Sequence, residues 1–176
     1  MLITSANSLP ERPGNCSKRC GDVEVPYPFG ILQNASGAVE NPECAIRNEF
    51  LFFCNTNLEP HRLFFGANMP IHNISVEEGT ISVKVDSAFQ CYSNLQLEFN
   101  FPQSTGLVGP FRFSDSHNKL TAIGCDTVVL MEDYEHTFGS GCISMCSKNA
   151  TLRGSCSGHG CCQTPVPKHE PRRVAF

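Results

Sequence analysis

This chain of 176 residues contains no tryptophan. It also lacks a long apolar run and an excess of basic residues, and each of these absences excludes a class of protein. No run approaches the roughly 18 consecutive apolar residues that a membrane-spanning helix needs, so we expect no direct membrane insertion. Lys and Arg number 13 against 17 Asp and Glu, for a net charge of -4. Because a nucleic-acid groove requires a basic excess, nucleic acid is not an expected partner.

Helical patterns and targeting signals are missing as well. No window longer than about ten residues carries apolar side chains at helical spacing, which favours β structure. The opening MLITSANSLPERPG has neither a basic region nor an apolar stretch of about 7 to 15 residues, so no signal peptide is predicted in this sequence.

Cysteine, in contrast, is abundant, with 11 residues in the chain. Such a content is typical of secreted proteins crosslinked by disulfides, and it indicates an oxidising compartment. An odd number leaves one cysteine unpaired or paired outside the chain, and the sequence does not determine the connectivity. The expected half-cystines are drawn from Cys16, Cys20, Cys44, Cys54, Cys91, Cys125, Cys142, Cys146, Cys156, Cys161 and Cys162.

Four Asn-x-Ser/Thr motifs agree with a secretory route. Asn15 is the weakest glycosylation candidate, because the middle residue of its motif is Cys16, which is expected to be bridged and buried early. N-glycosylation is therefore predicted at Asn34, Asn73 and Asn149.

Alternating apolar side chains predict a mainly β fold, a small disulfide-rich sheet or sandwich module. The clearest pattern is ISVEEGTISVKVD, residues 74–86, which predicts a hairpin that turns at Glu78 and Gly79. The first strand of this hairpin places Asn73 on the outward face, where a glycan would lie in water.

A second alternating stretch, residues 23–31, has Pro26 and Pro28 on its other side and predicts an edge strand or a strand that leaves the sheet, since proline cannot donate to a ladder. Its apolar side chains, Tyr27 and Phe29 among them, are expected to face the core. Further strands are predicted over residues 50–54, 63–65, 95–101, 111–114, 120–123 and 127–131.

Composition divides the chain into three parts. Residues 1–15 are expected to be a flexible leader, and residues 16–164 the cysteine-rich module. Within the module, residues 139–164 are rich in cysteine and glycine and are expected to be a loop segment held by bridges. The proline-rich, basic residues 165–176 are predicted to be a flexible tail.

Two alternative chemistries were weighed against the disulfide interpretation. CSKRC, CISMC and HGCC with His159 have the thiol spacing of a zinc site, but such sites belong to reducing compartments. GSCSG has the form of a nucleophile elbow with Cys156 at its apex, but the strand and helix that an elbow requires around it are not predicted. We therefore expect no metal site, no catalytic residues and no enzymatic activity.

The motifs of the module occur in a characteristic order. They are CxxxCG from Cys16, VPYPFGI from Val25, the Cys44 and Cys54 pair, Cys91, FRFSDSHNKLTAIGCD from Phe111, GCISMC from Gly141 and GSCSGHGCCQT from Gly154. Together, over residues 16–164, they resemble the galacturonan-binding module at the head of plant wall-associated receptor kinases. The epidermal-growth-factor-like repeats, membrane span and kinase domain of those receptors do not occur in this sequence.

The resemblance implies an extracellular, non-catalytic module that faces the plant cell wall and binds pectin, a polymer of galacturonic acid. Carboxylates on the unesterified sugars require Lys or Arg side chains. Residues 1–110 hold 6 basic and 11 acidic side chains, so these cations must form a local patch. The expected ligand-binding residues are Lys18, Arg19, Lys84, Arg112 and Lys119.

No cofactor is expected, apart from calcium that would bridge pectate to acidic residues such as Glu132, Asp133 and Glu135. The alternative function is that of a protein-interaction ectodomain or truncated receptor decoy. Such a module would bind a peptide or another receptor ectodomain through its prolines and an exposed sheet edge.

Overall fold

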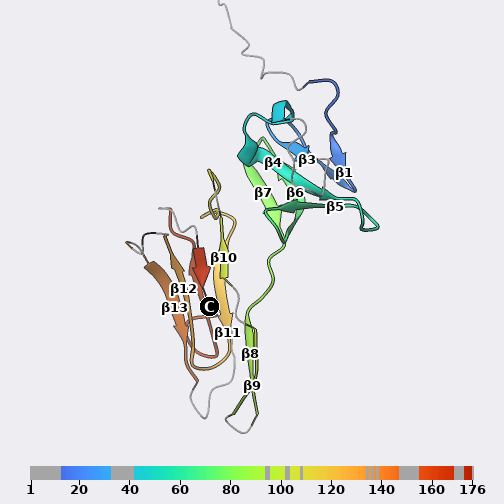
Figure 1. Cartoon of the computed structure of the whole chain (residues 1–176). Helices are drawn as coiled ribbons and strands as arrows, with labels where there is room; N and C mark the ends of the chain where they lie inside the picture. The colour runs from blue at the N-terminus through green and yellow to red at the C-terminus, as the bar shows by residue number, and fades with distance from the viewer. Residues whose placement is uncertain are drawn as a thin grey trace, which may run out of the picture. The chain divides into compact units, whose positions relative to one another are not determined.

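The computed structural model describes residues 13–32, 42–93, 96–101, 104–107, 109–133, 135, 137, 139–146, 155–168 and 173–175 (Figure 1). The fold of these residues is mainly β, as predicted, and its helical content is limited to two short 3-10 turns. The chain divides into two compact units, Met1–Val85 and Asp86–Phe176. Most of the predicted leader, residues 1–12, and the sequons at Asn34 and Asn149 lie outside the described residues.

The first unit is built on a five-stranded sheet of order β3-β4-β5-β6-β7 (Figure 1). β3 runs parallel to β4, and the other neighbours are antiparallel. The predicted hairpin of residues 74–86 forms the β6–β7 end of this sheet, with Gly79 in its turn at a φ of 64°. The strands are Gly30–Leu32 (β3), Leu51–Asn55 (β4), Arg62–Phe65 (β5), Met69–Ser75 (β6) and Thr80–Val83 (β7).

Alternation along the strands builds the core of this unit. Phe52 on β4 and Leu63 on β5 are 2% and 0% exposed and point to the same side of the sheet. Phe29 stacks on Phe52, with ring centroids 5.4 Å apart. The prediction that Phe29 faces the core agrees with this contact.

The continuous edge strand predicted over residues 23–31 is wrong. The chain instead forms a separate hairpin from β1 (Arg19–Cys20) and β2 (Val23–Glu24). It then turns, with the Phe29 N–H donating to the Pro26 carbonyl at 2.9 Å, before it joins the sheet at β3. The prolines explain the interruption, because neither can donate to a ladder.

Two disulfides hold the β1–β2 hairpin in place. Cys16–Cys44 joins the chain before β1 to the 3-10 turn η1 (Pro42–Cys44), and Cys20–Cys54 joins β1 to β4. A second 3-10 turn, η2 (Asn48–Phe50), leads directly into β4. An isolated hairpin of this size is marginal in water, so the bridges are what fixes it to the sheet.

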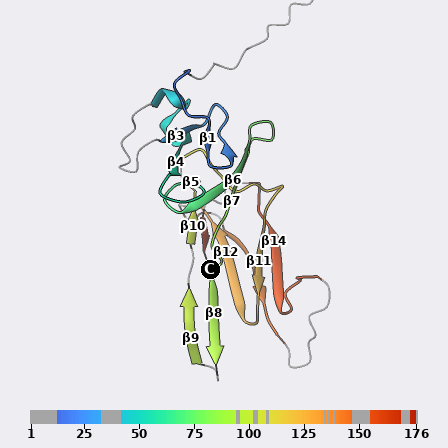
Figure 2. The same ribbon diagram turned by 90° about the vertical axis from the view of Figure 1, so that its right-hand side faces the viewer.

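The second unit contains three small antiparallel sheets (Figures 1 and 2). One has four strands in the order β10-β15-β12-β13, one pairs β11 with β14, and one is a ribbon of β8 and β9. The strands are Phe89–Ser93 (β8), Gln96–Phe101 (β9), Ser104–Gly106 (β10), Lys119–Ile123 (β11), Thr127–Glu132 (β12), Gly139–Ser144 (β13), Cys161–Pro165 (β14) and Arg173–Ala175 (β15).

The core of the second unit is small and is crosslinked. It consists of Leu120, Ala122, Val129, Met131, Cys162 and Val166. Phe113 packs against this cluster from a loop, so the strand predicted over residues 111–114 is not formed. β11 pairs with β14 in a separate two-stranded sheet. Three disulfides close this unit: Cys125–Cys146, Cys142–Cys162 and Cys156–Cys161.

Two parts of the second unit are more regular than predicted. The cysteine- and glycine-rich residues 139–164 contain all of β13 and most of β14. Gly141 permits this pairing, since a Cβ at its position would lie 2.1 Å from the Val129 carbonyl oxygen of β12. The tail, predicted to be flexible, contributes the buried Val166 to the core and the strand β15 between β10 and β12.

Candidate functional site

The predicted ligand-binding residues Lys18 and Arg19 lie at the β1–β2 hairpin, and both side chains are exposed. Arg19 Nη2 donates to the Asp22 carbonyl at 3.1 Å across the turn. The Lys18 carbonyl accepts from the Val25 N–H at 2.8 Å. Since Cys20 is bonded to Cys54 of β4, these two cations project from a crosslinked support and not from a free loop.

Arg62, which sequence reasoning missed, belongs to the same neighbourhood. The hairpin turn at Gly21 lies directly against the backbone carbonyl of His61. His61 is the residue before Arg62, which begins β5. The Arg62 side chain is exposed. In the sequence Arg62 is a single basic residue before an apolar strand, so nothing in the local pattern links it to Arg19. The disulfide and the backbone contact create that link.

Lys84, also predicted, follows the edge strand β7. Its N–H donates to the Pro70 carbonyl at 2.8 Å, which fixes the backbone, and its side chain is exposed. Arg47, just before η2, is a further exposed cation that was not predicted. The first unit therefore presents five exposed cations on its described surface: Lys18, Arg19, Arg47, Arg62 and Lys84.

The remaining two predicted residues belong to the second unit. Arg112 lies exposed in the loop that leads to β11, and Lys119 is the exposed first residue of β11, opposite Pro165 of β14. The five predicted ligand residues are thus divided between two units, and their role in one common site stays a prediction.

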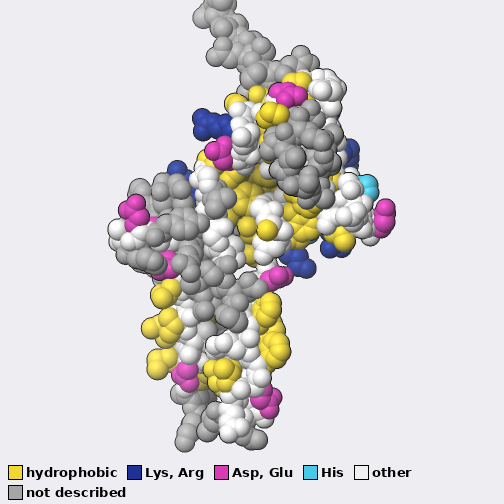
Figure 3. Space-filling model, viewed as in Figure 1, with side chains coloured by type: hydrophobic (Ala, Val, Ile, Leu, Met, Phe, Trp, Pro, Cys, Tyr) yellow, Lys and Arg dark blue, Asp and Glu magenta, His cyan; other side chains and the backbone are white. Residues whose placement is uncertain are grey.

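The electrostatic balance of the first unit is acidic despite these cations. Residues 16–85 hold 5 Lys and Arg against 8 Asp and Glu. On the face drawn in Figure 3, dark blue Lys and Arg side chains do not merge into one large patch. Among the described residues, however, none of the five cations forms an ion pair with an acidic side chain. Within the part of the chain that the structure describes, no carboxylate neutralises these five charges.

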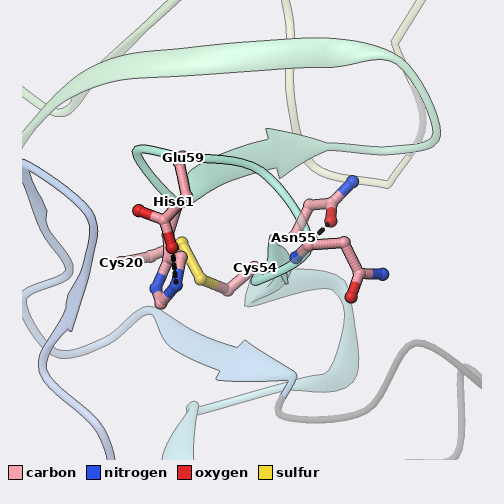
Figure 4. Close-up of polar contacts among 6 residues, drawn as sticks. Cys20, Cys54, Asn55, Glu59 and His61 are labelled. Carbon is pink, nitrogen blue, oxygen red and sulfur yellow. Dashed lines mark hydrogen bonds and ion pairs between the residues drawn. A yellow bond between two sulfur atoms is a disulfide. The ribbon is translucent and has the colours of Figure 1, made fainter.

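The described ion pair lies in the loop between β4 and β5 (Figure 4). There His61 Nε2 is 3.9 Å from Glu59 Oε1, beside the Cys20–Cys54 disulfide. At the other end of the loop, the Asn57 N–H donates to Asn55 Oδ1 at 3.0 Å. The Glu59 side chain is 91% exposed, so this pair contributes only about 0 to 1 kcal/mol to stability.

Aromatic side chains gather at the surface of the second unit, on the ribbon of β8 and β9. Phe89 stacks on Phe99 and on Phe101, with ring centroids 5.6 and 5.5 Å apart. These three side chains are 48%, 54% and 40% exposed. β9 confirms the strand predicted over residues 95–101, but its apolar side chains are not buried in a core.

The alternative chemistries find little support in the described residues. Cys156 is bonded to Cys161, so it has no thiol to act as a nucleophile. Across the ranges that the structure describes, no group of three or more His, Cys, Asp and Glu side chains is placed to hold a metal ion. Asp133 instead accepts hydrogen bonds from the Thr137 N–H and hydroxyl. No helix in the described part of the chain is long and apolar enough to span a membrane.

The pairing of the cysteines follows from the same structure. Ten form the five disulfides, and Cys91, exposed on β8, is free. The odd number in the sequence requires one such residue. The connectivity, which spacing left open, keeps every bridge within one of the two units.

Comparison with known proteins places these features in a family. A model described as wall-associated receptor kinase galacturonan-binding matches residues 16–85. The chain is 34% identical over 154 residues to wall-associated receptor kinase 2 of Arabidopsis thaliana, covering 87% of this chain and 19% of that protein. It is 29% identical over 151 residues to wall-associated receptor kinase 3, covering 85% and 19%. No solved structure matches the chain.

The chain spans about a fifth of the length of these relatives. The family match begins at Cys16, the first bridged cysteine, and ends at Val85, the last residue of the first compact unit. The family model and the first compact unit therefore share the boundary at Val85, whereas the similarity to the receptor kinases extends over 87% of the chain. The ordered cysteine, YPFG and GCCQT motifs agree with these matches: residues 16–85 match the wall-associated receptor kinase galacturonan-binding family, and most of the chain is similar to the wall-associated receptor kinases.

Proposed function

We propose that the chain is an extracellular, non-catalytic module whose first unit binds polygalacturonate, the unesterified pectin of the plant cell wall. The observation that carries this proposal is the coincidence of the family match, residues 16–85, with a compact unit that presents five exposed cations free of ion pairs to the described acidic residues. Each of these cations is able to make charge-assisted hydrogen bonds to a uronate carboxylate.

The binding is weak at each sugar and strengthened by repetition. An exposed charge contact contributes about 0 to 1 kcal/mol, so one cation does not hold an oligosaccharide. A polymer offers many equivalent carboxylates, and several modules on one polymer chain raise the avidity without any new kind of contact. Binding should therefore weaken with added salt and with methyl-esterification of the pectin, which removes the negative charges.

A charge-removal series on the full chain tests this function. We expect Lys18→Ala with Arg19→Ala to weaken binding of a demethylated oligogalacturonide by about 2- to 20-fold, from two contacts of the stated size. The same double substitution at Arg112 and Lys119 tests the candidates of the second unit. Lys168→Ala, an exposed cation outside the predicted set, is the control and should leave the affinity unchanged.

Salt-insensitive binding, or equal binding of fully methyl-esterified pectin, would contradict an electrostatic site. Calcium that bridges pectate to Glu132, Asp133 and Glu135 would make a separate, accessory contact of the polymer with the second unit. Removal of divalent ions with a chelator measures the contribution of calcium to the affinity for pectate. A fall in affinity that Glu135→Gln reproduces supports the bridge, and unchanged affinity contradicts it.

An alternative function, binding of a peptide or another receptor ectodomain, is supported by a different feature. One face of the β12–β13 pair exposes Val128 and Leu130 with Ile143 opposite Val128, 50%, 51% and 57% exposed. Exposed apolar sheet faces mark many protein interfaces. Binding of the full chain to demethylated and methylated pectin fragments, next to a pull-down with cell-surface ectodomains, distinguishes the two functions.

A further inference from the structure

The β6–β7 hairpin contains an irregularity that changes which residues face solvent. The register pairs Ile71 with Val83 and Asn73 with Ser82, so β6 advances two residues where β7 advances one. The extra residue, His72, is a β-bulge. Because of it, His72 and Asn73 are both exposed, between the buried Ile71 and Ile74.

Without the bulge, strict alternation from Met69 and Ile71 would place Asn73 in the core. The bulge turns it outward instead, and Asn73 is followed by Ile74 and Ser75, which completes an Asn-x-Ser motif. Within the described residues the Asn73 side chain has no hydrogen-bond partner. The residue opposite, Ser82, is small and exposed, so it leaves room beside the amide.

We propose that Asn73 carries an N-linked glycan on the outer face of the β6–β7 hairpin. The donor is an oligosaccharide linked to a lipid through a diphosphate. A bond forms between C1 of its terminal sugar and Asn73 Nδ2, the bond from C1 to the diphosphate oxygen breaks, the lipid diphosphate leaves and Nδ2 loses a proton. No oxidant or reductant takes part.

Glycopeptide mapping of the full chain secreted from plant cells tests the modification. We expect the peptide with Asn73 to carry a glycan and to contain Asp at position 73 after enzymatic deglycosylation. Apart from the CH2 group that each substitution adds, the glycan mass should be lost in Asn73→Gln and retained in Ser75→Thr, which keeps the motif. An unmodified Asn73 peptide overturns the proposal, whether or not Asn34 or Asn149 is glycosylated.

The position of this glycan has a consequence for the ligand surface. Lys84 lies two residues beyond Ser82 on the same side of the hairpin, about 7 Å along the strand, and both are exposed. The glycan therefore covers the approach to Lys84 and leaves Lys18, Arg19, Arg47 and Arg62 as the accessible cations of the first unit. This consequence rests on the proposed function.

The affinity for a demethylated oligogalacturonide tests the shielding of Lys84 separately from the presence of the glycan. We expect Lys84→Ala to have no effect in the glycosylated chain and to weaken binding about 2- to 5-fold in the chain that also carries Asn73→Gln. An equal loss in both backgrounds overturns the shielding of Lys84 while the mass measurement stands. If neither the glycosylated chain nor the Asn73→Gln chain binds any uronate, the proposed function and the shielding are overturned, but the glycan is not.

Discussion

Gly21 shows most clearly how a single residue holds the first unit together. Its φ of 57° lies in the left-handed region, and a Cβ at its position would stand 2.1 Å from the His61 carbonyl oxygen. Only glycine meets both conditions, because the first disfavours any L side chain and the second leaves no space for a methyl group. This contact seats the β1–β2 hairpin, and with it Lys18 and Arg19, against β5.

Gly66 provides a matched comparison. Its φ is 60°, but no atom lies within 4 Å of where its Cβ would be. We expect Gly66→Ala to lower the free energy of unfolding by about 1 to 2 kcal/mol, from backbone strain alone. Gly21→Ala should lose a further 1 to 3 kcal/mol, roughly the cost of overpacking. Denaturant unfolding of the oxidised chain measures both, and equal losses would contradict the close contact.

At the scale of the element, the disulfides fix strands and hairpins to one another where the cores are small. The Cys20–Cys54 bridge closes a separation of 34 residues and fixes the cation-bearing hairpin to β4, whereas Cys156–Cys161 closes only 5. A crosslink restricts the unfolded chain more when its loop is longer. The two bridges should therefore differ in their contribution to stability.

Double substitutions measure this difference without leaving a free thiol. We expect Cys20→Ala with Cys54→Ala to lower the free energy of unfolding by about 3 to 4 kcal/mol, and Cys156→Ala with Cys161→Ala by about 2 kcal/mol. The first variant should also lose affinity for oligogalacturonide, since its hairpin is released. If that variant keeps full affinity, the hairpin is not part of the ligand surface.

Alternation identified most strands but not which face of each strand is buried. The pattern LQLEFNF predicted a strand correctly, and β9 forms there, yet Phe99 and Phe101 stack on Phe89 at the surface. Local periodicity reports that one face is apolar, and it does not report whether another element covers that face. Residues 111–114 also alternate, but they form no strand, and Phe113 packs against the core from a loop.

At the scale of the whole molecule, the two units are separate compact bodies, and the family match ends where the first one ends. A ligand that binds the native state stabilises the unit that holds it, by about 2.7 kcal/mol at a hundredfold excess over Kd. Polygalacturonate should thus stabilise the first unit selectively.

Hydrogen exchange resolves the two units in one experiment. With a demethylated oligogalacturonide at that excess, the slowest amides of β4 and β5 should exchange about 100-fold more slowly. Those of β11 and β12 in the second unit should be unaffected. Protection confined to the second unit would place the ligand there and favour Arg112 and Lys119 over the first-unit cations.

The sequence by itself determined the similarity to the wall-associated receptor kinases, the mainly β class and the presence of one unpaired cysteine. The order of the motifs, the apolar alternation and the odd number of cysteines are all local or additive properties of the chain. The sequence also predicted the outward face of Asn73, but tertiary structure decided the disulfide pairing, the division at Val85, the bulge at His72 and the place of Arg62 beside the hairpin. Each of these depends on which distant segments meet, because backbone contact and crosslinking, not local pattern, bring them together.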